Sequence, residues 1–148
     1  MSSNYSPKVA IVIPTIFRDD LLMDTIETII ENCDMEETKI IIVDQNKEET
    51  YSERKRIFYE VACSQFHSEK RIEVIKVPYD SGISYCRNVA VELAKEQNIP
   101  YCFITADSIE FTESMKKLPK LLTYMKRYDI IGLDIKDRIG WEGILRLI

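Results

Sequence analysis

The chain has 148 residues, enough for one compact domain with a buried core. Its 20 basic and 25 acidic side chains leave a net charge of -5, which argues against a surface that neutralises a nucleic-acid backbone. Hydrophobic residues make up 45% of the chain, but the longest apolar runs are far shorter than the roughly 20 residues that span a bilayer. The N-terminus has no basic segment followed by an apolar stretch, so we expect no secretory signal and a cytoplasmic location.

Apolar runs and helical periodicities alternate along the chain, which predicts β-α-β units and a mainly parallel sheet. The expected elements are a strand over 8–14, a helix over 20–32, a strand over 39–44, a helix over 51–66, a strand over 71–77, a helix over 83–97, a strand over 101–105, a helix over 113–127 that breaks or bends near Pro119, and a strand over 129–133. Residues 1–7 form a tail in this scheme. Residues 8–148 are expected to form a single domain, in which 134–148 is an extension that a partner chain or a second copy could cover.

Two expectations concern the core. The helix over 51–66 should pack through its apolar residues, which are Ile57, Phe58, Val61 and Ala62. The cysteines are widely spaced and form no Cys-x-x-Cys pair; they are Cys33, Cys63, Cys86 and Cys102. This spacing favours reduced thiols in or near the core over a disulfide framework or a zinc site.

Polar residues follow the ends of four predicted strands. They are Pro14, Thr15 and Arg18 after the first, Asp44 to Asn46 after the second, Asp80 to Asn88 after the third, and Thr105 to Asp107 after the fourth. Ligands of open parallel sheets bind outside the carboxyl ends of the strands. We therefore expect these residues to converge on one edge, where a carboxylate such as Asp107 is well placed for a metal or a phosphate.

Taken in order, these segments resemble the motifs of the family-2 glycosyltransferases. Residues 9–15 are similar to the family's opening strand, which ends in Pro-Thr. Residues 41–46 lie where the family has a strand followed by Val-Asp-Asp-Gly-Ser, and Gly82 with 86–88 is similar to a glycine followed by Ala-Arg-Asn. Residues 101–107 lie where a strand leads into the family's Asp-x-Asp motif.

The resemblance covers residues 8–133 and implies a fold and a reaction. The fold would be the three-layer α/β/α, Rossmann-like GT-A fold, with a mainly parallel sheet that binds a nucleotide-diphospho-sugar. The reaction would be transfer of the sugar from a nucleotide-sugar, with a UDP-sugar as the expected donor, to an unknown acceptor with inversion.

The resemblance also implies a nucleotide-binding set, which is Pro14, Thr15, Arg18, Asp44, Gly82, Arg87 and Asn88. Asp44 would accept hydrogen bonds from the uracil or the ribose, and Thr15 with the backbone beside Pro14 would line the base pocket. Arg87, near a helix N-terminus, would bind the diphosphate. Structural alternatives stay open: a turn acid for Asp44, a strand-to-helix turn at Pro14 and Thr15, a surface ion pair for Arg87, and a local cap for Asn88.

Asp107 is the expected metal ligand, and here the chain departs from the family. Thr105 replaces the first acid of Asp-x-Asp and Ala106 fills the middle position, so Asp107 is the single carboxylate. Magnesium commonly binds through one or two carboxylates plus substrate phosphates, so we expect a divalent cation, Mn or Mg, that is weakly bound. Glu110 is a possible substitute ligand or an exposed loop acid. A second departure is Gln45-Asn46, which removes the second acid and the glycine of the family's nucleotide loop.

No catalytic residue is predicted. The family's general base comes from beyond the fifth strand, where Asp134 and Asp137 could equally be solvated turn residues. His67 has no motif partner, and Trp141 could stack on a sugar or cover the sheet edge. The alternative to a glycosyltransferase is therefore a non-catalytic, degenerate module for nucleotide binding or interaction. No Gly-x-Gly-x-x-Gly or P-loop motif favours a dinucleotide oxidoreductase or a P-loop protein.

Overall fold

The computed structural model describes residues 5–65, 71–127, 135–136 and 142–143. The chain divides into two compact units, Met1–Glu113 and Ser114–Ile148, and each is described by itself. The single domain over 8–148 stays a prediction, and the strand expected over 129–133 lies outside the described residues. Across the described ranges, no helix has the length and apolar character needed to cross a membrane.

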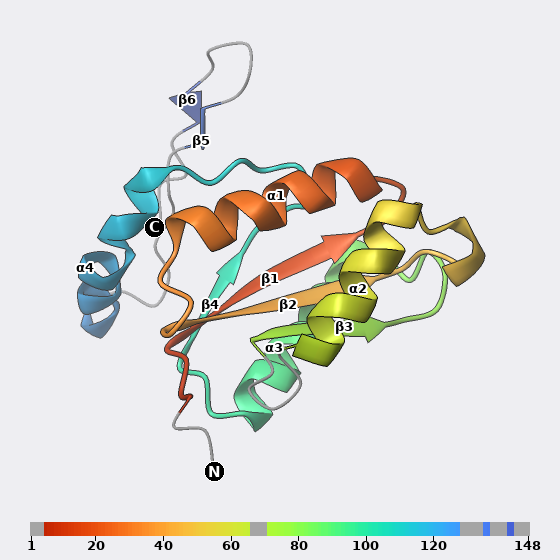
Figure 1. Ribbon diagram of the computed structural model, residues 1–148. Coiled ribbons are helices and arrows are strands. Elements are labelled where there is room, and N and C mark those ends of the chain that lie inside the picture. Colours follow the sequence, from red (N-terminus) through yellow and green to blue (C-terminus); the bar gives the residue numbers. More distant parts are fainter. Residues whose placement is uncertain (1–4, 66–70, 128–134, 137–141, 144–148) are drawn as a thin grey trace. The chain divides into compact units, whose positions relative to one another are not determined.

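The first unit is built on a four-stranded parallel sheet (Figure 1). Its strands are β1 (Val9–Thr15), β2 (Thr38–Asp44), β3 (Ile72–Lys76) and β4 (Tyr101–Ile104), in the order β3-β2-β1-β4. Every residue of β1 and β2 is buried, as continuous β-branched runs covered on both faces should be. The first four predicted strands are confirmed, and none of their bounds differs by more than one residue.

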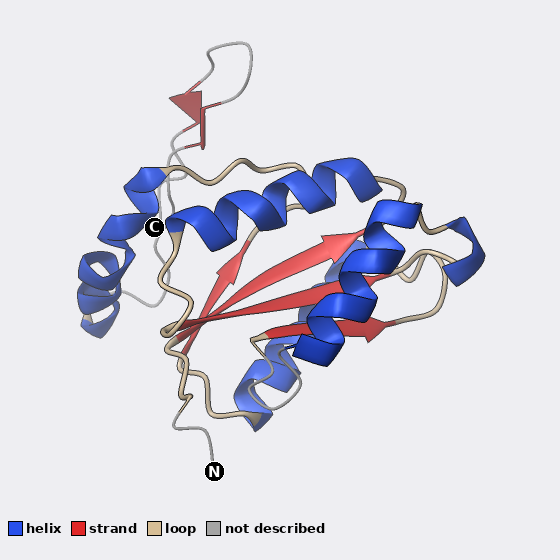
Figure 2. Cartoon of the chain, viewed as in Figure 1, coloured by secondary structure: helices blue, strands red, loops and turns tan. Residues whose placement is uncertain are grey.

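Helices cover both faces of this sheet, which gives the predicted three layers (Figure 2). The helices α1 (Asp19–Asn32) and α2 (Glu53–Gln65) lie on one face, and α3 (Ile83–Glu96) lies on the other. Under α3, small side chains allow close packing in a core of Ala10, Val12, Ile41, Val43, Cys86, Ala90, Ala94 and Ile99. The alternate residues of β1 point to the opposite face, where α1 buries Leu22, Ile26 and Ile29.

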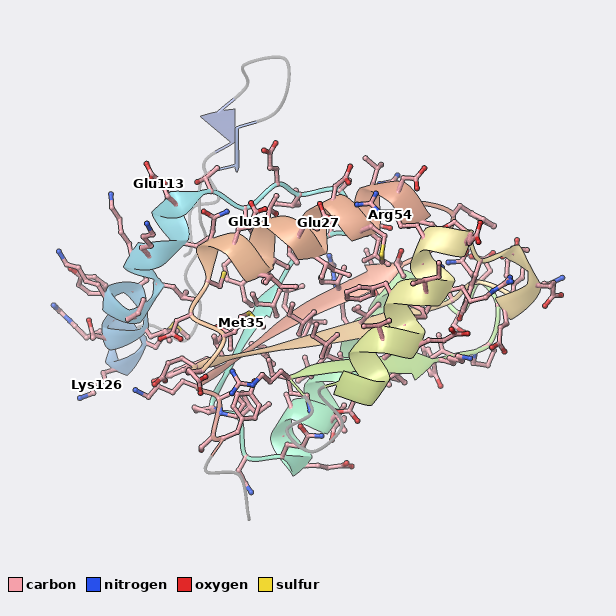
Figure 3. The ribbon with its side chains drawn as sticks, in the orientation of Figure 1. Glu27, Glu31, Met35, Arg54, Glu113 and Lys126 are labelled. Atoms are coloured by element: carbon pink, nitrogen blue, oxygen red, sulfur yellow. The ribbon has the colours of Figure 1, made fainter. Side chains whose placement is uncertain are left out.

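The packing face of α2 differs from the prediction. Ile57 and Val61 are 52% and 43% exposed, whereas Lys55 and Tyr59 are buried. The prediction failed because polar contacts, rather than apolar packing, set the orientation of this helix: Lys55 pairs with the buried Asp44 and the half-buried Asp19. On the outer side, Arg54 reaches across to α1 and pairs with Asp24 and Glu27 at 3.1 and 2.9 Å (Figure 3).

The strand order places a change of direction in the middle of the sheet. The chain runs outward from β1 to β2 and β3 on the α1 and α2 face, and then crosses on the α3 face to β4, on the far side of β1. The crevice outside the carboxyl ends of β1 and β4 is therefore a topological switch point, where open α/β sheets bind ligands.

The described cysteines Cys33, Cys86 and Cys102 are free thiols, as predicted. Cys33 is half-buried, and burial raises its pKa to about 11. Cys86 lies in the core, but Cys102 is exposed on β4, outside the environment that the sequence suggested. The side chain of Cys63 lies outside the described residues.

The second unit contains a short helical segment and a small hairpin. A 3-10 turn over Glu113–Lys117 leads into α4 (Leu118–Thr123), which a second 3-10 turn over Tyr124–Lys126 follows. Pro119 stands at the start of α4, where its missing N–H costs nothing, so the predicted break near Pro119 is confirmed. The strands β5 (Ile135–Lys136) and β6 (Glu142–Gly143) pair antiparallel within the expected extension.

Candidate functional site

The carboxyl ends of the strands bring the predicted site residues to one edge. Thr15 ends β1 beside Asp44, which ends β2, and Asp44 in turn pairs with Lys76 at the end of β3. On the other side, β4 pairs with β1 only as far as Val12, and the Thr105 N–H donates to the Val12 carbonyl at 3.1 Å. Beyond that bond β1 continues to Thr15 without a β4 partner, and this is the position of the switch point.

Pro14 lies in this stretch of β1 and is buried. Parallel strands direct alternate residues to alternate neighbours. The Thr15 carbonyl accepts from the Gln45 N–H, on the β2 side, and the Val12 carbonyl accepts from the Thr105 N–H, on the β4 side. Pro14, which alternates with Thr15, therefore turns its backbone toward the β4 side, just past the end of β4. A proline is tolerated there because no ladder hydrogen bond is lost.

Asp107 is the acid that enters the crevice, and it is 6% exposed. The Thr15 hydroxyl donates to its Oδ2 at 2.9 Å, and the Arg18 Nη1 lies 3.5 Å from its Oδ1. The Thr25 hydroxyl of α1 donates to its backbone carbonyl at 3.0 Å and fixes the turn. Burial raises the pKa of Asp107, while the Thr15 hydrogen bond, the charge of Arg18 and hydrogen bonds from the backbone N–H groups of Asp107 and Ile16 oppose that rise. The carboxylate is therefore held in place beside an exposed arginine.

The metal-binding capacity of this edge rests on Asp107. Thr105, at the position of the missing acid, is buried, and Glu110 is exposed. Within the part of the chain that the structure describes, no group of three or more His, Cys, Asp and Glu side chains could hold a metal ion. A cation at Asp107 would thus need further oxygen ligands from a bound substrate and from water.

Asp44 contrasts with Asp107, since its carboxylate is fully buried and fully bonded. Its Oδ1 accepts from the backbone N–H and the Nδ2 of Asn46 at 2.8 and 2.9 Å. Its Oδ2 accepts from the Tyr59 hydroxyl at 2.6 Å and lies 3.0 Å from Lys55 Nζ. Four donors match the four lone-pair positions of a carboxylate. Direct contact with a base stays a prediction, and it would require one of these donors to be displaced.

Lys55 is the buried cation behind Asp44, and its side chain is 0% exposed. Besides Asp44, it pairs with Asp19 at the start of α1 at 2.6 Å, and its Nζ lies 4.0 Å from the centre of the Tyr51 ring. Burial and the nearby Asp44 raise the pKa of Tyr59, so its hydroxyl stays protonated and donates. The sequence reasoning missed this cluster, although Tyr51, Lys55 and Tyr59 recur at helical spacing.

Gln45 and Asn46 were expected only as departures from the family, yet both are buried and join three loops. The Gly82 N–H donates to Gln45 Oε1 at 2.8 Å, and the Phe17 N–H donates to Asn46 Oδ1 at 2.8 Å. The loop after β2 thus fixes the loop after β1 and the start of α3.

The start of α3 carries the other predicted nucleotide-binding residues. Gly82 has φ 96° and ψ 150°, a conformation that is essentially restricted to glycine. Arg87 is half-buried, and its Nε is buried without a hydrogen-bond partner among the described residues. Asn88 is exposed. The structure places all three on the helix that begins at the sheet's carboxyl edge.

An exposed aromatic pair at this edge was also missed. Phe17 after β1 is 67% exposed and Tyr79 after β3 is 49% exposed, and their ring centres are 5.8 Å apart at 71°. Lys47 Nζ lies 5.0 Å from the Tyr79 ring centre. Both aromatic residues come directly after strand ends, and that position is the signal that could have identified them.

Other candidates lie outside the described residues. These are His67, Asp134, Asp137 and Trp141. No general base is assigned within the described ranges.

Comparison with known proteins gives the fold and the family. The chain is similar to crystal structures of S. aureus TarS residues 1–349, at 12% identity and TM-score 0.60, covering 82% of this chain and 33% of that one. For the complex of the same protein with UDP-GlcNAc, the TM-score is 0.59 at 12% identity, with 82% and 32% covered. For the mannosyltransferase PcManGT from Pyrobaculum calidifontis with GDP-Man and Mn²⁺, it is 0.58 at 14% identity, with 82% and 33% covered.

These likenesses confirm the GT-A fold, and this chain spans about a third of the length of the structures that it matches. No curated protein matches the sequence closely enough to count as a relative. The family model described as Glycosyl transferase family 2 matches residues 10–142. The chain therefore belongs to glycosyl transferase family 2.

Proposed function

We propose that the crevice outside β1 and β4 binds a nucleotide-sugar, with a UDP-sugar as the donor, and that the sugar is transferred from it to an acceptor. The observation that carries this proposal is Asp107. It is a buried carboxylate at the topological switch point, held by Thr15 and approached by the half-exposed Arg18. Structural neighbours of this chain were solved with UDP, UDP-GlcNAc and GDP-Man, which supports the same donor class here.

The base of the donor would lie over Phe17, with Thr15 and Pro14 below it. An exposed aromatic ring at a strand end offers a stacking surface for a nucleobase, and stacking tolerates any base because every base has a π-face. Asp44 would support this pocket indirectly. Its carboxylate binds the Asn46 amide, and that amide in turn binds the backbone of Phe17.

The diphosphate would lie between the two arginines. Arg18 is 57% exposed and is held only by long contacts, 3.5 Å to Asp107 and 3.5 Å to Ser108, so it can turn toward a phosphate. Arg87, in the second turn of α3, offers a guanidinium whose Nε has no hydrogen-bond partner among the described residues, and the space around Gly82 at the start of that helix is open. Asn88 on the same helix completes the proposed set. Bidentate arginines suit phosphate oxygens.

A divalent cation, Mn or Mg, fits Asp107 as a weak site. Its carboxylate already accepts from the Thr15 hydroxyl and from the backbone N–H groups of Ile16 and Asp107, and Arg18 lies 3.5 Å from its Oδ1, so a hard cation that the diphosphate also ligates would have to displace one of these contacts. When bound, the cation would neutralise charge on the leaving nucleotide. One structural neighbour was solved with Mn²⁺.

Transfer would follow direct displacement at the anomeric carbon, with inversion. Thr15 and Arg18 would orient Asp107, and the arginines would hold the departing diphosphate. The acceptor hydroxyl would lose its proton to a base outside the set assigned here. Thr105 in place of an acid favours a second candidate, a donor-binding module without transfer activity.

Calorimetric titration with UDP, GDP and UDP-GlcNAc, with and without manganese, tests donor binding. We expect UDP and UDP-GlcNAc to bind more tightly with manganese, and we expect Asp107→Ala to lose that enhancement. Glu92→Ala, which removes an exposed acid of α3, is the matched control. Release or transfer of the sugar that Asp107→Ala abolishes supports the enzyme, whereas binding without turnover supports the module. No nucleotide binding at millimolar concentration would reject both.

A further inference from the structure

Phe17 has a backbone conformation that its own side chain does not favour. Its φ is 60°, in the left-handed region, where a residue with a Cβ atom is disfavoured. The side chain is 67% exposed, so burial of the ring does not compensate. Such conformations persist where neighbouring groups impose them, and they concentrate at ligand-binding sites.

Asn46 is the group that holds Phe17 in this conformation. Its Oδ1 accepts the Phe17 N–H at 2.8 Å, while its Nδ2 donates to Asp44 Oδ1 at 2.9 Å. The orientation of the amide is fixed by chemistry, because an N–H can only donate and a carboxylate can only accept. Asn46 is 9% exposed, and its backbone N–H also donates to Asp44 at 2.8 Å.

Asp44 is itself immobilised from the opposite side. Tyr59 and Lys55, both on α2, engage its other oxygen at 2.6 and 3.0 Å. A continuous series of hydrogen bonds and ion pairs therefore runs from a buried helix face through the end of β2 to an exposed aromatic ring.

We infer that Asn46 is a positioning residue, which holds the Phe17 ring where the nucleobase of the donor stacks. This inference rests on the proposed function. The Phe17 ring lies against the Tyr79 ring, with 5.8 Å between their centres. The loops after β1 and β3 therefore form one aromatic surface at the sheet edge. Gln45 and Asn46 replace an acid and a glycine of the usual family loop. Neither an ionised acid nor a glycine has a side chain that can donate to Asp44 and accept from the Phe17 N–H at once, as the amide of Asn46 does.

The test is a double-mutant cycle of Phe17→Ala and Asn46→Ala, read out by binding of UDP and of inorganic pyrophosphate. Loss of base stacking is worth about 1–3 kcal/mol, so each single variant should bind UDP roughly tenfold more weakly. Pyrophosphate affinity should not change. Because Asn46 acts through Phe17, the double variant should be no weaker than Phe17→Ala alone. Additive losses would overturn the inference.

Asn32→Ala is the matched control, since Asn32 also bonds two backbone carbonyls, those of Thr28 and Phe111, away from this edge. It should leave UDP affinity within about twofold of wild type, as expected of a distant, independent site. If Asn46→Ala fails to fold, Asn46→Ser replaces the amide by a shorter side chain, whose single oxygen would have to stand in for both Nδ2 and Oδ1; the same losses are expected.

A measurement without ligand separates this inference from the proposed function. Nuclear Overhauser contacts between the Phe17 and Tyr79 rings should be present in the wild type and in Asn32→Ala, and should be lost in Asn46→Ala. If they persist in Asn46→Ala, positioning by Asn46 is wrong even when UDP binds. If they are lost but the wild type binds no nucleotide, the proposed function fails, and with it the assignment of the ring to a base.

Discussion

Asp44 and Asp107 are buried acids at the ends of two strands that flank β1, yet their surroundings differ. Asp44 has four close donors, one of which is Lys55, whose side chain is 0% exposed. Asp107 accepts from the Thr15 hydroxyl and from backbone N–H groups, and its cation is Arg18, which is 57% exposed and 3.5 Å away. The first carboxylate has its partners inside the protein. The second carboxylate faces a cation that is exposed to solvent and can turn away from it toward a ligand. Burial of the carboxylate alone therefore does not distinguish the two acids; the exposure of the cation that faces each one does.

The largest expected effect is on the Asp44 side. Lys55→Met removes the cation from between Asp19 and Asp44 and leaves both carboxylates without it, so we expect the free energy of unfolding to fall by about 3–5 kcal/mol. Urea denaturation of the variant and the wild type measures this difference in unfolding free energy. Arg54→Met is the control, because the neighbouring Arg54 pairs with exposed acids, and its loss should cost under about 1 kcal/mol. An equal loss of unfolding free energy in the two variants would show that the buried pairs of Lys55 stabilise the protein no more than the exposed pairs of Arg54.

A smaller loss is expected when Tyr59 is changed to Phe. The variant deletes a 2.6 Å hydrogen bond to a buried carboxylate while keeping the ring, so the unfolding free energy should fall by about 2 kcal/mol. Tyr85→Phe removes the hydroxyl of an exposed tyrosine and should change stability very little. Wild-type stability in Tyr59→Phe would mean that Asp44 does not depend on this donor.

The smallest effect on stability is expected at Asp107. Because burial raises its folded-state pKa, the native state binds the proton more tightly than the unfolded chain does. This acid therefore costs stability as the pH rises from about 4, the unfolded value, through its raised folded-state pKa.

Asp107→Asn should remove that decline, and at pH 7 it should change the unfolding free energy by less than about 1 kcal/mol. Urea denaturation between pH 4 and pH 8 compares the variant with the wild type. A loss at pH 7 as large as that of Lys55→Met would show that Asp107 is a structural acid like Asp44.

The sequence predicts the parallel sheet, and it predicts that Thr15, Arg18 and Asp107 lie together at the carboxyl edge of that sheet. Buried β-branched runs specify parallel strands, and parallel strands end at a common edge. The sequence also predicts the break near Pro119, because the proline ring determines where a helix can start.

The sequence does not predict which side chains complete the buried contacts. Ile57 and Val61 predict an apolar face for α2, but the helix packs through Lys55. This lysine pairs with Asp19 of α1 and Asp44 of β2, two carboxylates that lie far from it and from each other in the chain. Likewise, nothing local in the sequence indicates that Asn46 meets the backbone of Phe17, 29 residues earlier. Such pairings depend on tertiary contacts.

A crystal structure of the chain soaked with UDP and manganese tests the central claim most directly. We predict that the cation binds the Asp107 carboxylate and the diphosphate, that the base lies on Phe17, and that Asp44 keeps its bonds to Asn46 and Lys55. Nucleotide bound elsewhere, with the contacts of Asp107 to Thr15 and Arg18 unchanged, would contradict the assignment of the donor site to the crevice between β1 and β4.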